Sequence, residues 1–267
     1  MKKKHVLCCG NISFDFIASL PAKNGAFSLN ARPGGSVLNT VVQISRLGIP
    51  VSILSKTGED FLSDLLVELL EKEHVDTSFL VTDPGIKTGL AVAKLDRKGD
   101  SSYIFYRPEG RITAFAPPEI RADILDHADV LHTGSTYSYK DHTFDNALSL
   151  LEKAREKGVF STFDPNWRTG RVKNRKKAFR RIRRLMDTCS LPKMSMKGIM
   201  DLTGARTIKS ALKKVRPRTV VTLGAKGSLF WDGSRGLHQD PFKVKVRDTI
   251  GAGDAFTSGL IYMYFNK

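Results

Sequence analysis

The residues most able to do chemistry lie near the end of the chain, in the stretch DTIGAGDAFTSGLI from Asp248 to Ile261. Two glycines flank Ala252 just before an apolar segment of helical length. Such a turn can aim successive backbone N–H groups at one point, at the positive end of a helix dipole, and this is typical of an anion site. Asp254 falls in the first turn of that helix. A carboxylate there suits phosphoryl transfer, in which it accepts the proton of an attacking hydroxyl. The alternative is a glycine-rich helix start that Asp254 only stabilises.

The full string from Asp248 to Ile261 resembles the C-terminal signature of the PfkB/ribokinase family of carbohydrate kinases, and it fits at every specified position. In that family the aspartate matching Asp254 is the catalytic base. The amides matching Gly251, Ala252 and Gly253 form the anion hole. The resemblance therefore implies a sugar kinase that uses ATP and Mg²⁺. Because Mg²⁺ is expected to bridge ATP oxygens and keep most of its waters, no residue is assigned as a metal ligand.

A second glycine-rich segment predicts the acceptor side of the site. The sequence GGSVLN, which ends at Asn39, resembles the family's N-terminal signature, although Val37 and Val41 stand where the family usually has smaller residues. Glycines let a sugar approach the backbone, and an asparagine both donates to and accepts from hydroxyls. Asp15 follows the first expected strand, where family members use an aspartate to bind sugar hydroxyls. Asp15, Gly35 and Asn39 together resemble the set of residues that binds the sugar; the alternative for Asp15 is a solvated turn.

Two arginines narrow the substrate class. Arg107 ends the sequence FYR, and Asn166 and Arg168 lie in FDPNWR after an expected strand. Both stretches resemble the fructokinase and 2-keto-3-deoxygluconate kinase branch of the family. A guanidinium suits a carboxylate or a polyhydroxylated acceptor, so a hexose or sugar acid is favoured over a nucleoside. The alternative is a pair of surface arginines.

The nucleotide side is predicted in VTLGAKGSL, where Thr222, Gly224 and Gly227 follow an expected strand. Glycines after a strand let amides and a threonine hydroxyl meet phosphate oxygens. The segment resembles the part of the family that lies along the ATP phosphates and ribose. Ser195 and Thr249 are assigned to the same side of the site.

The chain departs from the family in two places. Most members carry an Asn-x-x-Glu motif whose glutamate helps to organise magnesium and phosphates, and here Ser195 and Gly198 occupy those two positions. Gly198 should weaken metal-assisted catalysis unless Lys193, Ser195 or Asp201 compensates. The chain also stops soon after the apolar helix expected at Ala255–Phe265, so the usual C-terminal tail is lacking. We expect either that a second subunit covers this helix or that the product is shortened.

Composition favours a cytoplasmic α/β protein. The chain has 267 residues, of which 41% are hydrophobic, and three cysteines without metal-ligand spacing. No membrane span or signal peptide is expected. The net charge of +16 is concentrated partly in a basic cluster between Arg168 and Arg184. Because no nucleic-acid motif accompanies this cluster, a solvated helix face is favoured over a specific nucleic-acid site.

Alternating short strands and helices predict one ribokinase-like domain over residues 1–267, a three-layer α/β/α arrangement with a mostly parallel sheet. Strands are expected at Val6–Gly10, Val51–Ser55, Val130–Thr133, Val159–Asp164 and Thr219–Leu223, and helices at Val37–Leu47, Phe61–Lys72, Phe144–Lys157 and Arg175–Met186. Period-two patterns within about 12–33 and 86–112 predict a small antiparallel sheet. The resemblance implies that this sheet is a lid that closes over the sugar and pairs two subunits into a homodimer.

The sequence thus predicts an ATP-dependent kinase for a hydroxyl of a sugar or sugar acid, with Asp254 as the base. Its rival is a catalytically impaired or truncated relative that only binds a sugar or a nucleotide. The identity of the sugar and the hydroxyl phosphorylated are left open.

Overall fold

The structure is a computed structural model that describes residues 5–23, 26–95, 101–106, 120–121, 123–134, 143–167, 174–246 and 249–266. The chain divides into two compact units. The first contains residues 1–4, 8–119 and 245–267, and the second contains residues 5–7 and 120–244. Strand β1 (Val6–Cys9) contributes residues to both units. Each unit is described by itself below.

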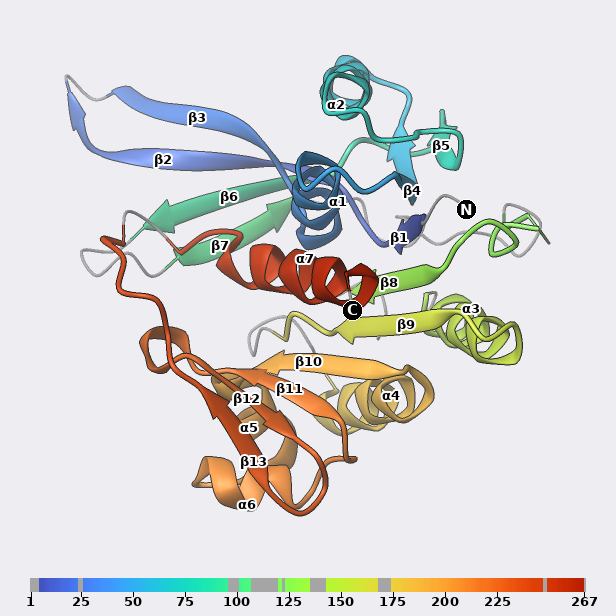
Figure 1. Cartoon of the computed structure of the whole chain (residues 1–267). Coiled ribbons are helices and arrows are strands. Elements are labelled where there is room, and N and C mark those ends of the chain that lie inside the picture. Colours follow the sequence, from blue (N-terminus) through green and yellow to red (C-terminus); the bar gives the residue numbers. More distant parts are fainter. Residues whose placement is uncertain are drawn as a thin grey trace. The chain divides into compact units, whose positions relative to one another are not determined.

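In the first unit, strands are ordered β1-β4-β5, and β4 (Val51–Gly58) pairs in parallel with β5 (Leu80–Asp83). Helix α1 (Ser36–Arg46) buries an apolar face that includes Val37, Val41 and Ile44. Helix α7 (Ala252–Phe265) packs alongside α1 (Figure 1). Asp60 is the N-cap of helix α2 (Phe61–Lys72), and its side chain accepts a hydrogen bond from the backbone N–H of Ser63.

The first unit also contains a four-stranded sheet in the order β3-β2-β6-β7. Two antiparallel hairpins build it, one from β2 (Ser13–Lys23) and β3 (Ala26–Gly34) and one from β6 (Leu90–Leu95) and β7 (Ser101–Tyr106). The hairpins meet along β2 and β6, which run parallel. This confirms the predicted small sheet, with one parallel pairing at its centre.

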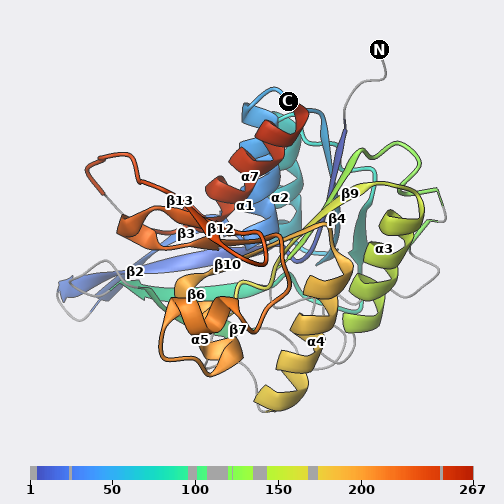
Figure 2. The same ribbon diagram turned by 60° about the horizontal axis from the view of Figure 1, so that its bottom comes forward.

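The second unit holds strands in the order β13-β12-β11-β10-β9-β8. Four of them are parallel: β8 (Val130–Gly134), β9 (Phe160–Asp164), β10 (Leu191–Ser195) and β11 (Thr219–Thr222). Strands β12 (Ser228–Trp231) and β13 (Gly236–Gln239) continue antiparallel. Helices α3 (Phe144–Glu156) and α4 (Arg175–Thr188) lie side by side (Figure 2), and α5 (Met196–Thr203) packs with α6 (Ile208–Leu212).

The nine strands and helices predicted in the main fold are all present, with ends shifted by at most a few residues, and α7 begins three residues earlier than expected. The prediction missed strands β5, β10, β12 and β13 and the short helices α5 and α6. Strand β10 has the sequence LPKMS, in which a proline and a lysine obscure the apolar pattern that marks a buried strand. The expected single domain stays a prediction.

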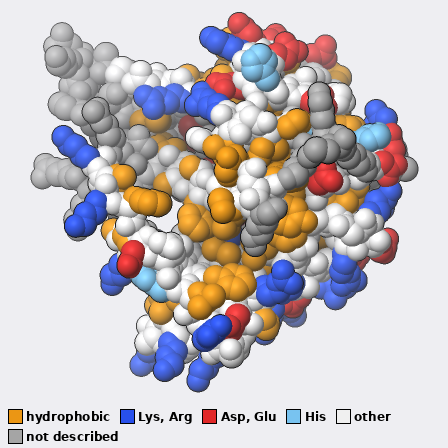
Figure 3. Space-filling view, viewed as in Figure 1, with side chains coloured by type: hydrophobic (Ala, Val, Ile, Leu, Met, Phe, Trp, Pro, Cys, Tyr) orange, Lys and Arg blue, Asp and Glu red, His pale blue; other side chains and the backbone are white. Residues whose placement is uncertain are grey.

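Helix α7 is apolar nearly all round, yet only one of its faces is buried. Its buried residues are Asp254, Thr257, Ser258, Ile261 and Phe265, so one face is covered. Tyr262, Met263 and Tyr264 are exposed. Figure 3 shows the same view as Figure 1, and hydrophobic side chains gather there over the place of α7.

The three cysteines belong to the hydrophobic interior. Cys8 and Cys9 lie in β1 and Cys189 follows α4, and each side chain is buried with a free thiol. Burial raises the pKa of the Cys9 and Cys189 thiols to about 12. Among the described residues, no helix is both long enough and apolar enough to cross a membrane.

Candidate active site

The start of α7 places Asp254 at the centre of the candidate site. Gly251 caps the helix in the left-handed conformation, with a φ of 76°, which a residue with a side chain would adopt at a cost. The chain thus turns sharply into the helix, and Asp254 falls in its first turn. Its side chain is largely removed from solvent, since the residue is 8% exposed. The Ala252 amide donates to the Thr249 carbonyl at 3.3 Å, a long hydrogen bond within the turn.

Helix α1 supplies a direct contact to this carboxylate. The Asn39 side-chain amide donates from Nδ2 to Oδ2 of Asp254 at 2.8 Å, across 215 positions of sequence. The same helix pair is joined one turn further along, where the Ser258 hydroxyl interacts with the Thr40 carbonyl at 3.2 Å. The glycine-rich segment before α1 and the one before α7 are therefore brought together at a single carboxylate in the first unit.

The backbone just before α1 lies very close to two other segments of the same chain. Gly35 has a φ of 104°, and a Cβ there would lie 2.6 Å from the Asn11 carbonyl oxygen. A Cβ on Gly34 would lie 2.4–2.7 Å from the carboxyl atoms of Asp15. Both glycines are therefore needed for packing. Gly34 leaves room for the Asp15 carboxylate on β2, and this places Asp15 beside the start of α1.

On the second unit, two predicted nucleotide-side residues lie next to each other. Ser195 ends β10 and Thr222 ends β11, and they are register partners in this parallel pair. The Ser195 hydroxyl accepts a hydrogen bond from the Gly198 amide at 3.1 Å and so caps α5. After Thr222 the chain makes a 3₁₀ turn over Gly224–Lys226.

That 3₁₀ turn requires glycine at both ends. Gly224 has a φ of 63° and Gly227 a φ of 84°. A Cβ on Gly227 would lie 2.0 Å from the Gln239 carbonyl oxygen, which no side chain could tolerate. The Gly227 amide donates back to Gly224 within the turn. The turn is thus a closed, rigid feature after strand β11.

A buried ion pair supports the neighbouring strand ends. Lys193 Nζ on β10 lies 2.6 Å from Asp164 Oδ2 on β9, and the two side chains are 5% and 13% exposed. The other carboxylate oxygen of Asp164 accepts a hydrogen bond from the backbone N–H of Asn166 at 2.9 Å. Asn166 has a φ of 42°, a conformation that such a local hydrogen bond helps to hold. Asp164 therefore fixes the turn that carries the predicted acceptor residue Asn166.

His132 lies buried near this pair. One ring nitrogen, Nδ1, forms a hydrogen bond with the Thr162 hydroxyl at 2.8 Å. Burial lowers the pKa of His132 to about 4, the Asp164 carboxylate opposes that shift, and the Lys193 ammonium adds to it. His132 is therefore neutral at neutral pH and acts as part of the polar interior of this sheet.

Gly198 occupies a crowded place at the start of α5. A Cβ there would lie 3.1 Å from Ser195 Oγ and 3.3 Å from the terminal carbon of Met194. Asp201, one turn further along, accepts a hydrogen bond from the Trp167 indole at 3.3 Å. Two of the groups expected to compensate for the missing glutamate are thus engaged, since Asp201 contacts Trp167 and Lys193 contacts Asp164.

Two predicted site residues are not described. Arg107 and Arg168 lie outside the described residues, and their assignments stay predictions. Thr249 is exposed at the start of the α7 turn. In the described part of the chain, no three His, Cys, Asp or Glu side chains gather in a way that could hold a metal ion.

A family model for the pfkB family carbohydrate kinases matches residues 3–267. The chain belongs to the pfkB family of carbohydrate kinases. Among curated relatives, it is 30% identical to fructokinase-1 of Zea mays over 267 residues, which cover 96% of this chain and 81% of that protein. It is 29% identical to the probable fructokinase-4 of Arabidopsis thaliana, with 97% and 82% covered. This kinase is therefore an enzyme that phosphorylates a sugar.

Solved structures confirm the ribokinase-like fold of this pfkB kinase. A fructokinase of Vibrio cholerae, bound to fructose, ADP and a potassium ion, superposes with a TM-score of 0.84 at 25% identity, covering 98% of this chain and 83% of that one. The Xylella fastidiosa fructokinase with bound ATP gives a TM-score of 0.86 at 24% identity, covering 99% and 82%. The predicted three-layer α/β fold with a mostly parallel sheet is thus confirmed.

Three residues that bear on this kinase's site escaped the sequence prediction or received another role. Ser36 opens α1, and its buried hydroxyl finds no hydrogen-bond partner among the described residues. The sequence signal that could have identified Ser36 is its place directly after Gly34 and Gly35. Asp164 and Lys193 form the buried pair described above. Because the two lie on separate strands, only the strand order brings them together.

Proposed function

We propose that this kinase transfers the γ-phosphoryl group of ATP to a hydroxyl of a hexose or sugar acid, in the manner of a fructokinase, with Asp254 as the general base. The observation that carries the proposal is the hydrogen bond from Asn39 to Asp254, because it unites the acceptor-side helix with the carboxylate beside the glycine turn. The curated relatives named fructokinase support the acceptor class.

The residues of the first unit divide the work of the acceptor side. Asp15, Gly35 and Asn39 bind sugar hydroxyls, and the unpartnered hydroxyl of Ser36 adds a donor and an acceptor beside Gly35. Arg107 serves as a further contact to the acceptor, as do Asn166 and Arg168 of the second unit. The four-stranded sheet acts as the lid that excludes water.

Asp254 accepts the proton of the acceptor hydroxyl as this oxygen attacks the γ-phosphorus of ATP, and the bond from that phosphorus to the bridging oxygen breaks so that ADP leaves. Asn39 keeps one oxygen of this carboxylate in place. The amides of Gly251, Ala252 and Gly253 stabilise the negative charge that develops on the phosphoryl oxygens. When bound, ATP supplies the phosphoryl group and Mg²⁺ offsets its charge.

On the nucleotide side, we assign Ser195, Thr222, Gly224 and Gly227 to ATP, with Thr249 beside the α7 turn. The pairing of Ser195 with Thr222 at the carboxyl ends of two parallel strands supports this assignment, because ligands of open α/β sheets bind at that edge. Mg²⁺ draws its ligands chiefly from ATP oxygens and water.

A homodimer formed through the lid is part of the proposal. Large hydrophobic side chains on the outer strands of the four-stranded sheet support it, since Leu29, Ile104 and Tyr106 are each at least half exposed. A monomeric mass by light scattering, at concentrations where the enzyme is active, would contradict this assembly.

The test measures ADP release with ATP and Mg²⁺ against fructose, ribose, 2-keto-3-deoxygluconate, tagatose phosphate and adenosine. We expect turnover with fructose or the sugar acid. Asp254→Asn should lower kcat by roughly 10²- to 10⁴-fold, the usual contribution of a general base, while acceptor binding persists. Wild-type kcat in Asp254→Asn would refute the mechanism. Folded protein that binds but does not turn over any acceptor would instead indicate the impaired relative that Gly198 suggests.

A further inference from the structure

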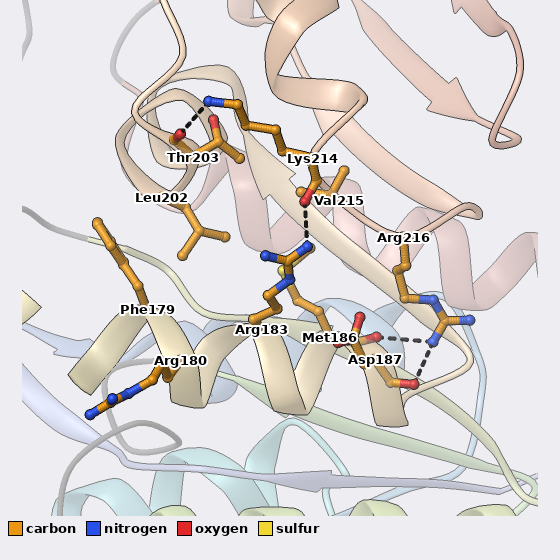
Figure 4. Close-up of a pocket in the computed structure, with 10 residues that line it drawn as sticks. All are labelled: Phe179, Arg180, Arg183, Met186, Asp187, Leu202, Thr203, Lys214, Val215 and Arg216. Atoms are coloured by element: carbon orange, nitrogen blue, oxygen red, sulfur yellow. Dashed lines mark hydrogen bonds between the residues drawn. The ribbon is translucent and has the colours of Figure 1, made fainter. Parts of the chain in front are cut away.

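A cationic groove in the second unit has no role in the proposed reaction. It has a volume of about 310 Å³. Helix α4 forms one wall, and the end of α5 together with the segment that leads into β11 forms the other (Figure 4). Its four basic residues are Arg180 and Arg183 of α4 and Lys214 and Arg216 of that segment. Among the residues that the structure describes, Asp187 is the one acidic residue that lines it.

The positive charge of the groove is not neutralised by carboxylates. Arg183 donates to the Lys214 carbonyl at 3.0 Å, and Lys214 Nζ donates to the Thr203 carbonyl at 3.0 Å. These neutral acceptors position the cations and leave their charge in place. Within the described part of the chain, no ion pair involves Arg180, Arg183 or Lys214.

Arg216 differs from the other three cations. Its Nη1 atom donates to the carbonyls of Met186, Asp187 and Cys189, at the end of α4 (Figure 4 shows the first and second of these residues). The negative end of the helix dipole therefore offsets this guanidinium. Arg216 serves to fix the floor of the groove. The Arg180 guanidinium points away from Arg183 and Lys214 (Figure 4), so the net attraction for an anion in the groove comes from Arg183 and Lys214.

Apolar side chains form the rest of the wall, notably Phe179 and Leu202 on opposite sides of the groove. The Phe179 ring is itself held by Trp167, with ring centroids 4.8 Å apart. A ligand that fits must therefore combine a negative group with a compact apolar body. Guanidinium groups bind phosphate with particular strength because two N–H donors can meet two oxygens.

The groove lies at the opposite end of the strands from the proposed nucleotide site. Asp187 and Arg216 precede β10 and β11, at the amino ends of these strands. Ser195 and Thr222 stand at the carboxyl ends of the same two strands. One small ligand cannot touch both ends, so the groove is a separate site.

We propose that this groove binds a small organic phosphate, a monoester with a compact aromatic or apolar body, through Arg183 and Lys214. The volume lies at the lower end of the range for small-molecule sites, which suits a ligand of this size. The phosphate lies against the guanidinium of Arg183, and the apolar body contacts Phe179 and Leu202.

Phenyl phosphate is the probe, titrated calorimetrically into the full chain at about 150 mM salt, where exposed charges are screened beyond ~8 Å. Benzyl alcohol serves as the uncharged comparison and should not bind. The variant Arg183→Gln/Lys214→Gln should bind phenyl phosphate roughly tenfold more weakly or worse, since it loses two charge-assisted donors. The matched control Lys176→Gln/Arg184→Gln removes the same charge from α4 outside the groove and should keep the parent affinity.

Four outcomes overturn the proposal: no saturable binding, equal binding of benzyl alcohol, equal weakening in both double variants, or weakening in neither. Equal weakening of binding in both double variants would reveal a general charge effect. Unchanged binding in both would show that the phosphate binds elsewhere. Circular dichroism establishes that each variant is folded. If the groove variant does not fold, Lys214→Gln alone decides, because it keeps the hydrogen bond from Arg183 to the backbone carbonyl of residue 214. Parent affinity in that single variant also refutes the site.

Discussion

At the scale of single residues, the contact between Asn39 and Asp254 has the most consequence for activity. The carboxylate is 8% exposed, so each hydrogen bond it accepts inside the protein counts for more than it would in water. Asn39 reaches one of its oxygens from a different helix. It therefore acts as a positioning residue for the proposed base, besides its assigned contact with the sugar.

Replacing Asn39 should separate these two roles. Asn39→Ala removes the hydrogen bond to Asp254 and is expected to lower kcat about tenfold, the worth of one hydrogen bond to a charged group. Steady-state kinetics against the best acceptor measures kcat and KM. Asn39→Gln, which keeps the amide on a longer side chain, should recover part of kcat. A change confined to KM in Asn39→Ala would show that Asn39 contacts only the sugar.

At the scale of secondary-structure elements, strand β10 shows what the sequence could and could not predict. The five longer helices α1 to α4 and α7, and four of the parallel strands, follow from apolar patterns of period 3.6 or from short apolar runs. In β10, Lys193 is only 4% exposed, yet a lysine argues against a buried position. Its partner Asp164 lies 29 positions away on β9, so only the paired strands make that burial favourable.

The candidate site divides in the same way. Asp254 and Asn39 were predictable because each lies in a glycine-rich segment next to a helix start, and local sequence encodes such turns. Their mutual hydrogen bond was not predictable, because it depends on how α1 packs against α7. The unpartnered hydroxyl of Ser36 was hidden for the same reason.

Breaking the buried pair should destabilise the second unit strongly. Lys193→Met leaves the Asp164 carboxylate without its cation in a buried place, and the free energy of unfolding should fall by roughly 3–5 kcal/mol. Urea unfolding followed by circular dichroism measures this. The exposed pair of Lys157 and Asp126 gives the control: Lys157→Met should cost about 0–1 kcal/mol. Similar losses in both variants would show that the buried pair is not special.

At the scale of the whole molecule, the buried neutral imidazole of His132 couples stability to pH. Its pKa is about 4 in the folded chain, against 6.5 as the ordinary value. Between these two values the unfolded chain binds more protons than the folded one at this residue, so acid favours unfolding. Above pH 6.5 both states are neutral and the residue has no effect.

We therefore expect this residue to lower the free energy of unfolding as the pH falls from about 6.5 to 4, by on the order of 3 kcal/mol in total. Urea unfolding at several pH values in this window measures the slope. His132→Gln keeps a polar side chain beside Thr162 but does not titrate, so its slope should be shallower. Equal slopes in the two proteins would show that His132 is not a source of the acid sensitivity.

The buried cysteines also determine how this protein can be labelled. All three native thiols lie in the interior, and for Cys9 and Cys189 burial raises the pKa to about 12, so almost no thiolate is present in the folded chain. A maleimide dye reacts through the thiolate of an accessible cysteine. A single cysteine introduced on the exposed face of α4 or on β7 would then carry the dye alone, and the native cysteines could stay in place during fluorescence measurements that test the proposed lid movement.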